Sequence, residues 1–300
     1  MIAFALPGFA SLLPKDSVAT GRLLVERFPN RELSLRLETD VDGQPCVLVG
    51  SVAPPDEQLL GLLLAADTLQ RHGATEVAAL LPYLGYARQD KQEPARGLGI
   101  AWIGRLLSAC GVERIVTIDV HSARAGELLE VPLRSISPAG LLGAELERAE
   151  LLGATVVAPD EGALGRCRAV AQAAGIEQPV AFLRKQRTPT GVVHGELVGH
   201  VGRRAVIVDD ILDTGETLVS CCRELRRQGV EDMIVMVTHG LFTGEGWKIL
   251  PSLGVSRIYA TDSVPSAARR AQEGAQLLSV RPLLEQAALR SPDDEEPARP

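Results

Sequence analysis

The stretch VIVDDILDTGET, residues 206–217, runs from an apolar segment through acidic residues into a Thr-Gly-Glu-Thr turn. The apolar segment predicts a buried strand, and the apolar spacing over 217–229 predicts a helix directly after the turn. The first N–H groups of a helix lack partners within the helix and point at an anion placed before it. Because Thr214 and Thr217 add two hydroxyl donors, the stretch predicts a phosphate-binding turn at the carboxyl end of a strand.

Two acids precede this turn. Asp209 and Asp210 stand where the sugar of a bound sugar phosphate would lie, and their carboxylates can accept hydrogen bonds from cis ribose hydroxyls. An ordinary strand, turn and helix with acidic capping residues would account for any one of these residues, but not for the whole pattern. We therefore expect a 5-phosphoribose group to be bound by Asp209, Asp210, Asp213, Thr214, Gly215 and Thr217.

Strands and helices alternate on both sides of this stretch. The β-branched runs lie at 46–51, 76–83, 114–120, 154–160, 204–210, 232–240 and 257–262, and the helical patterns at 57–73, 100–111, 162–175 and 217–229. This rhythm predicts an α/β fold with mainly parallel sheets flanked by helices. Because the rhythm restarts, we expect two domains, 1–136 and 137–290, and the charged, Pro-rich segment 291–300 is typical of disorder.

The composition is that of an ordinary globular protein, with 46% hydrophobic and 23% charged residues in a length of 300. A formal net charge of −7 argues against a general nucleic-acid partner. The five cysteines form no C-x-x-C pair or metal-ligand pattern, which fits a reducing compartment such as the cytoplasm. The apolar start lacks a basic n-region and no run of about 18 apolar residues occurs, so we expect neither a signal peptide nor a membrane partner.

Further polar stretches follow predicted strands, where ligands of α/β sheets gather. They are PYLGYARQDKQ (82–92), TIDVH (117–121) and VAPDEG (157–162). In the first, Arg88 offers a planar fork suited to phosphate or to an adenine ring, and Gln89 can read polar atoms. A solvated charged loop would explain RQDKQ alone, but not the whole stretch.

These stretches, taken in order, resemble one family. The 206–217 pattern resembles the phosphoribosyl-binding motif shared by phosphoribosyltransferases and ribose-phosphate diphosphokinases (PRPP synthetases), whereas the stretch 82–92 resembles a motif of PRPP synthetases alone. The resemblance implies two phosphoribosyltransferase-like domains, each a mainly parallel sheet flanked by helices. It also implies transfer of the diphosphoryl group of ATP to C1 of ribose 5-phosphate, which yields PRPP and AMP.

The resemblance further implies a role for each matching residue. It implies that His121 and Asp160 bind Mg²⁺. It also implies that Lys185 and Arg187, which lie on a mobile loop in the family, are catalytic. ATP binding falls on Phe28, Asn30, Glu32, Arg88, Gln89 and Asp90. Because the segment around Phe28 reaches the ATP of a neighbouring subunit in the family, the resemblance implies a homo-oligomer built from dimers, such as a hexamer.

The chain departs from the family pattern at several positions. Asn30 and Arg31 replace Asp and Gly in the R-F-x-D-G-E motif, Ala163 replaces the second Gly of D-x-G-G, and Glu216 puts a carboxylate in the phosphate turn. We expect the Glu216 side chain to point outward.

A separate departure concerns regulation. Asp40, Asp42 and Gly73 stand where the common bacterial form has Ser and Arg residues that hold a regulatory phosphate. Two carboxylates would repel an anion. We therefore expect activation by free phosphate, and inhibition by ADP at that site, to be absent or altered.

Two other functions stay open at this point. A phosphoribosyltransferase that consumes PRPP would share the 206–217 motif, although the stretch 82–92 argues against it. A non-catalytic PRPP-synthetase-like subunit that regulates an active partner would explain the departures at Asn30, Arg31 and Ala163. Retention of the metal-binding and catalytic positions argues against this second alternative.

Overall fold

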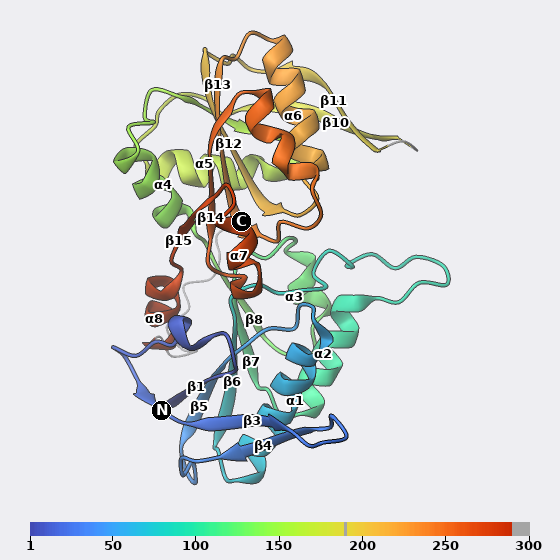
Figure 1. Cartoon of the computed structure of the whole chain (residues 1–300), viewed down its shortest axis with the longest axis vertical. Helices are drawn as coiled ribbons and strands as arrows, with labels where there is room; N and C mark the ends of the chain where they lie inside the picture. Colours follow the sequence, from blue (N-terminus) through green and yellow to red (C-terminus); the bar gives the residue numbers. More distant parts are fainter. Residues whose placement is uncertain (189–190, 290–300) are drawn as a thin grey trace. The chain divides into compact units, whose positions relative to one another are not determined.

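A computed structural model describes residues 1–188 and 191–289. Their contacts divide the chain into two compact units (Figure 1). The N-terminal unit comprises Met1–Ile136 together with residues 280–289, and the C-terminal unit comprises Ser137–Ser279. The tail 291–300, for which the sequence predicts disorder, lies outside the described residues.

The N-terminal unit is built on a six-stranded sheet in which every neighbouring pair is parallel. Its strands stand in the order β2 (Ala19–Thr20), β1 (Ile2–Ala5), β5 (Pro45–Val49), β6 (Glu76–Leu81), β7 (Arg114–Ile118) and β8 (Leu133–Ile136). Its connecting helices are α1 (Asp56–Arg71), α2 (Gly99–Ala109) and α3 (Arg124–Leu128). Parallel neighbours need crossover connections, and the predicted alternation of strand and helix supplies them.

In helix α1 the sequence determines both the buried face of the helix and the residue at which the helix ends. Leu59, Leu62 and Leu69 recur at helical spacing and are buried, so one stripe of the helix faces the sheet. The helix ends before Gly73, which has φ of +87° and donates its N–H to the Gln70 carbonyl at 3.1 Å. Glycine is favoured at this position because a Cβ is unfavourable in the left-handed region.

An antiparallel hairpin, β3 (Leu23–Arg27) and β4 (Leu33–Leu37), lies apart from the six-stranded sheet, and β4 packs against α1. We did not predict this hairpin from the sequence. The alternation LSLRL over 33–37 is the signal that indicates β4.

The C-terminal unit is built on a seven-stranded sheet. Its strands stand in the order β11 (Gly191–Val198), β10 (Ala181–Thr188), β9 (Thr155–Ala158), β12 (Arg204–Leu212), β13 (Asp232–Gly240), β14 (Val255–Thr261) and β15 (Gln276–Leu278). Every pair is parallel except β10 with β11. The α/β class and mainly parallel sheets predicted from the sequence are therefore confirmed, and β15 is a further strand beyond the last predicted one.

Helices cover both faces of this second sheet. Residues of α4 (Ala139–Arg148) and α5 (Leu164–Ala173) share one core cluster with Val206 and Val208 of β12. Helix α6 (Glu216–Arg227) lies on the other side of the sheet (Figure 1). Short helices η2 (Glu161–Ala163), η3 (Gly246–Leu253), η4 (Pro265–Ala267) and α7 (Ala268–Ala271) complete the unit.

The last described helix, α8 (Arg281–Leu289), falls within the predicted domain 137–290, but the structure groups it with the N-terminal unit. Helix α8 packs against the short helix η1 (Ala10–Leu12), and Arg281 Nη2 lies 2.9 Å from Asp16 Oδ2. These contacts join the two ends of the described chain. None of the described helices is long and apolar enough to cross a membrane.

The tip of the β3–β4 hairpin generates a stability prediction. Arg31 has φ of +71°, a left-handed conformation that costs a non-glycine residue about 1–2 kcal/mol. We expect Arg31→Gly to raise the free energy of unfolding by about 0.5–1 kcal/mol, because the relieved strain exceeds the added entropy of the unfolded chain. Urea denaturation would measure it. The contact from Arg27 Nη1 to Arg31 reaches the main-chain oxygen at 2.5 Å, so the variant keeps it. An unchanged or lower stability would argue against strain at this tip.

Candidate functional site

The candidate site of the C-terminal unit lies where the direction of strand progression reverses. Strands β9 and β12 are neighbours, yet β10 lies on the far side of β9 and β13 on the far side of β12. Loops that leave two such strands diverge, and the crevice between them is where ligands of open α/β sheets bind. The loop after β9 carries Asp160, and the loop after β12 carries the turn Asp213–Thr217. The fold therefore brings the predicted metal-binding acid and the predicted phosphate turn to the same edge.

The conformation of the predicted phosphate turn depends on Gly215. This residue has φ of +90°, and α6 begins at the next residue, Glu216. A Cβ on Gly215 would lie 2.7 Å from Trp247 Cα and 3.0 Å from Trp247 N. Glycine is required here for two reasons, the left-handed backbone and the closeness of a neighbouring main chain.

The segment after β13 holds this turn in place. Leu241 and Phe242 donate their N–H groups to the Leu212 carbonyl at 2.8 and 3.1 Å, and Thr243 donates to the Asp213 carbonyl at 3.1 Å. Trp247 is 2% exposed, and its ring makes an edge contact with Phe242 at a centroid distance of 4.9 Å. We did not identify Trp247 or Phe242 from the sequence. Tryptophan in a chain with only 3% aromatic residues is the one signal that could have marked the support of the turn.

The two acids lie inside β12, which continues to Leu212, two residues beyond the end that we predicted at 210. Successive residues of a strand face opposite sides of the sheet. Asp210 shares the side of Val206 and Val208, which α5 covers, and its carboxylate lies 4.0 Å from Arg166 Nη2. Asp209 accepts the N–H of Asp210 at 3.0 Å.

Burial raises the pKa of Asp209 well above its ordinary value, and the negative charge of Asp210 raises it further. The Arg166 guanidinium acts in the opposite direction. Two adjacent acids at a buried strand end therefore make the unliganded site electrostatically unfavourable.

Asp160 leaves the sheet at the level of Asp210. Val157 pairs with Ile207, and each acid lies three residues beyond its member of this pair. Asp160 Oδ1 accepts the Ala163 N–H at 3.2 Å and so caps η2. Ala163 itself has φ of −83° and is buried in the core beside α5. The replacement of the family's glycine at this position is therefore compatible with the backbone.

The predicted catalytic residues Lys185 and Arg187 lie on β10, where the backbone pairs Lys185 with His194 and Arg187 with Val192 of β11. Their side chains lie outside the part of the chain that the structure describes, as do residues 189 and 190 between the two strands. Both residues thus belong to a hairpin at the edge of the sheet that carries the phosphate turn.

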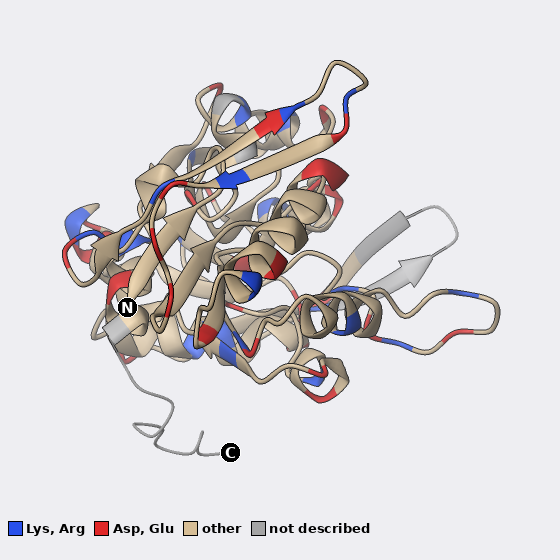
Figure 2. Cartoon of the chain, turned by 90° about the horizontal axis from the view of Figure 1, so that it is seen from below, with Lys and Arg blue, Asp and Glu red and all other residues tan. Residues whose placement is uncertain are grey.

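The N-terminal unit gathers a second set of predicted residues. Strands β6 and β7 are neighbours, so the loops that follow them leave the same edge of the sheet. The loop after β6 carries Arg88 and Gln89, both exposed, and Asp90, which is 8% exposed. The loop after β7 carries His121, which is exposed. Figure 1 shows the loop before α2 protruding from the unit, and Figure 2 shows charges of both signs along it.

The tip of the β3–β4 hairpin carries the last predicted group. Phe28 is 55% exposed, although aromatic rings are usually buried. Asn30 Oδ1 accepts the N–H of Glu32 at 3.2 Å, and Phe28 exchanges backbone hydrogen bonds with Arg31 and Glu32. The hairpin thus presents an exposed aromatic ring at its tip.

A metal at these sites would depend on few protein ligands. No three His, Cys, Asp or Glu side chains converge as a metal cluster among residues 1–188 and 191–289. His121 belongs to the N-terminal unit and Asp160 to the C-terminal unit. Asp160 fits Mg²⁺, which prefers oxygen ligands and is bound by one or two carboxylates together with substrate phosphates and water.

A helix N-terminus preceded by a Thr-Gly turn, at the switch point of a parallel sheet, is typical of the class of α/β proteins that bind phosphate-bearing ligands. Comparison with known proteins narrows this class. Residues 10–111 match the family model described as the N-terminal domain of ribose phosphate pyrophosphokinase, and residues 159–290 match the phosphoribosyl synthetase-associated domain.

Relatives agree with the family models. A ribose-phosphate pyrophosphokinase of Methanopyrus kandleri is 35% identical over 270 residues, 85% of this chain and 92% of the relative. One of Cereibacter sphaeroides is 30% identical over 88% of this chain and 81% of the relative. The crystal structure of phosphoribosylpyrophosphate synthetase from Mycobacterium smegmatis matches with a TM-score of 0.84 and 27% identity, over 95% of this chain and 96% of that one. The chain belongs to the ribose-phosphate pyrophosphokinase family, as its motifs indicated.

The raised pKa of Asp209 generates a prediction about stability. Between its pKa in the unfolded chain and its higher pKa in the folded chain, the unfolded chain releases a proton that the folded chain keeps, so stability falls as pH rises. Asp209→Asn removes this effect. We expect the unliganded variant to be more stable than the wild type at about pH 8, by a margin that shrinks towards about pH 5 with a slope of at most about 1.4 kcal/mol per pH unit.

Urea unfolding of both proteins over this pH range would measure the margin. A gain in stability at high pH is specific to an acid whose pKa is raised in the folded chain. If the fold instead kept this carboxylate ionised, its substitution would make the protein less stable. A margin that does not vary with pH, or a less stable variant throughout, would contradict the prediction.

Proposed function

We propose that this protein transfers the diphosphoryl group of ATP to the C1 hydroxyl of ribose 5-phosphate, giving PRPP and AMP, with the two acids and the turn of the C-terminal unit holding the sugar phosphate. The observation that carries the proposal is the Gly215 turn, fixed against Trp247 at the start of α6 with Asp209 and Asp210 on the strand before it. Membership of the ribose-phosphate pyrophosphokinase family supports this reaction as the one that the site performs.

The turn binds the 5-phosphate. The first N–H groups of α6, together with the hydroxyls of Thr214 and Thr217, supply the donors, and the positive end of the helix dipole adds to them. The carboxylates of Asp209 and Asp210 accept hydrogen bonds from the ribose hydroxyls, which fixes the orientation of C1. Asp213 continues the same loop.

The N-terminal unit binds ATP through Arg88, Gln89 and Asp90. The exposed guanidinium of Arg88 can neutralise phosphate charge or stack on the base. The hairpin tip with Phe28, Asn30 and Glu32 reaches the nucleotide of a neighbouring subunit, so the working enzyme is a homo-oligomer built from dimers. The exposed Phe28 ring supports this assignment, because base stacking in such an interface removes it from water.

Catalysis of this transfer consists mainly of positioning and charge neutralisation. Lys185 and Arg187, on the β10–β11 hairpin, neutralise charge that develops on the transferred group. His121 of the N-terminal unit and Asp160 of the C-terminal unit would each bind Mg²⁺, directly or through water. A bound Mg²⁺ supplies further neutralisation of phosphate charge.

The test is incubation of purified protein with ATP, Mg²⁺ and ribose 5-phosphate, with AMP and PRPP measured. We expect both products in equal amounts from the wild type. Lys185→Ala should lower kcat by about 10²-fold or more, since loss of one such contact removes about 2.7–4 kcal/mol of transition-state stabilisation. Binding of ribose 5-phosphate, measured by calorimetry, should change little.

Three outcomes would contradict these assignments. AMP formation that needs PRPP and a base instead would indicate a phosphoribosyltransferase. Absence of turnover, with activity restored or modulated by a partner protein, would indicate a regulatory subunit. A Lys185→Ala variant as fast as the wild type would remove this residue from the mechanism.

We further propose that this enzyme lacks activation by free phosphate. The Asp42 carboxylate packs against Gly73, where an added Cβ would lie 2.3 Å from Asp42 Oδ1, and Asp42 donates its N–H to Asp40 Oδ1 at 3.2 Å. Two carboxylates at this turn disfavour an anion. We expect the initial rate to be independent of added inorganic phosphate at constant ionic strength, and a saturable rise in rate would refute the idea.

A further inference from the structure

Arg166 is a cation that the structure places against the sugar-binding acids of the C-terminal unit. Its side chain is 14% exposed, that of Asp210 is 9% exposed, and Arg166 Nη2 lies 4.0 Å from Asp210 Oδ2. No motif that we used assigned Arg166 a role. A carboxylate with so little access to water needs a nearby opposite charge.

The position of Arg166 in its helix indicates a function other than helix stability. It is the third residue of α5, and its charge therefore stands in the first turn, where the helix dipole disfavours cations. The helix begins just after the Asp160 loop, at the same edge of the sheet as the phosphate turn. Arg166 also lowers the pKa of Asp209 against the effect of burial, so its charge acts on Asp209 as well as lying beside Asp210.

We propose that Arg166 is a positioning residue for ribose 5-phosphate, which holds the Asp210 carboxylate in the place and orientation that the sugar hydroxyls require. The inference rests on the proposed function of the C-terminal unit as the site of the sugar phosphate. Arg166 acts through Asp210 and contributes to binding of the sugar, not of ATP.

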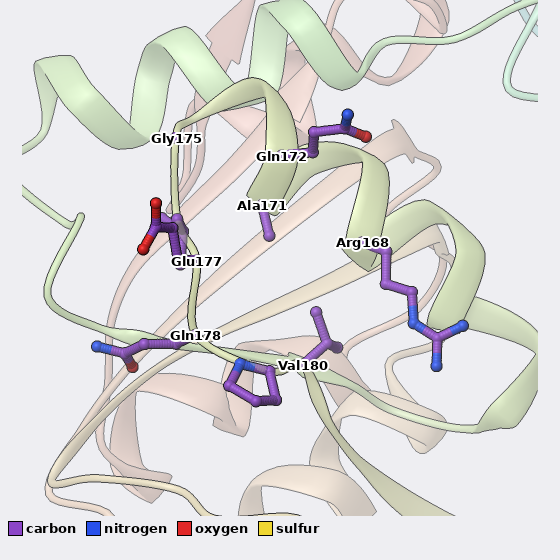
Figure 3. Close-up of a pocket in the computed structure, with 9 residues that line it drawn as sticks. Arg168, Ala171, Gln172, Gly175, Glu177, Gln178 and Val180 are labelled. Atoms are coloured by element: carbon purple, nitrogen blue, oxygen red, sulfur yellow. The ribbon is translucent and has the colours of Figure 1, made fainter.

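The same helix offers a matched control. Arg168 is exposed and lies two residues further along α5, beside a cavity of about 510 Å³ that the helix forms with residues 175–180 (Figure 3). Substitution of Arg168 removes the same charge from the same helix without touching the acids.

The experiment compares steady-state kinetics of Arg166→Met, Arg166→Lys and Arg168→Met. We expect Arg166→Met to raise KM for ribose 5-phosphate by about tenfold or more, which matches the loss of a hydrogen bond to a charged group. KM for ATP should not change. Arg166→Lys should recover part of the loss because it restores the charge but not the planar fork, and Arg168→Met should behave as the wild type.

Kinetics in the Asp210→Asn variant show whether Arg166 acts through Asp210. In Asp210→Asn, which is itself expected to bind the sugar weakly, Arg166→Met should add little to KM for ribose 5-phosphate, because coupled residues are not additive. Circular dichroism would check that each variant is folded. If Arg166→Met is not folded, Arg166→Lys is compared with Arg168→Lys instead. KM for ribose 5-phosphate must then rise in Arg166→Lys and stay unchanged in Arg168→Lys.

The inference fails if KM for ribose 5-phosphate is unchanged in the folded Arg166 variants, or if KM for ATP rises by the same factor. It also fails if the effects of Arg166→Met and Asp210→Asn are additive. These results are distinct from failure of the proposed function, which would appear as absence of PRPP synthesis in the wild-type enzyme.

Discussion

The pairing of β12 with β9 on one side and β13 on the other is the constraint on which the candidate site depends. It brings Asp160 level with Asp210, and it lets the segment after β13 donate hydrogen bonds to the carbonyls of the phosphate turn. Because β9 and β12 are followed by strands on opposite sides, their loops diverge, and ligands of open α/β sheets bind at such points. The sheet order therefore sets the place of the candidate site, and the local sequence supplies the hydrogen-bond donors and acceptors.

The site is built from features that oppose stability. Two adjacent acids at a buried strand end and a cation in the first turn of α5 each carry a cost in the absence of ligand. The rest of the unit compensates, through apolar strands that helices cover on both faces and through Trp247 packed against the turn. A sugar whose hydroxyls donate hydrogen bonds to the two acids would offset part of the cost of placing these acids together.

The sequence predicted this arrangement in part. Short apolar strands, helical spacing and the Thr-Gly turn are local patterns, and they predicted the α/β class, the principal strands and the turn between β12 and α6. The support of the turn by Trp247 and the contact of Arg166 with Asp210 join residues far apart in the chain, and local patterns carry no record of such contacts. The β3–β4 hairpin is a different case, because the alternation at 33–37 indicated it and was not used.

The departures from the family pattern differ in physical meaning. Ala163 occupies a helical conformation with its methyl group in the core, so the site tolerates it. Glu216 is exposed at the first position of α6. A carboxylate there interacts favourably with the helix dipole but would repel a phosphate bound at the same helix end. Solvent and salt weaken both effects because the side chain points outward. The exposed position of Glu216 would therefore also keep its repulsion of a phosphate in the proposed site small, which is a physical reason for a carboxylate to be tolerated there.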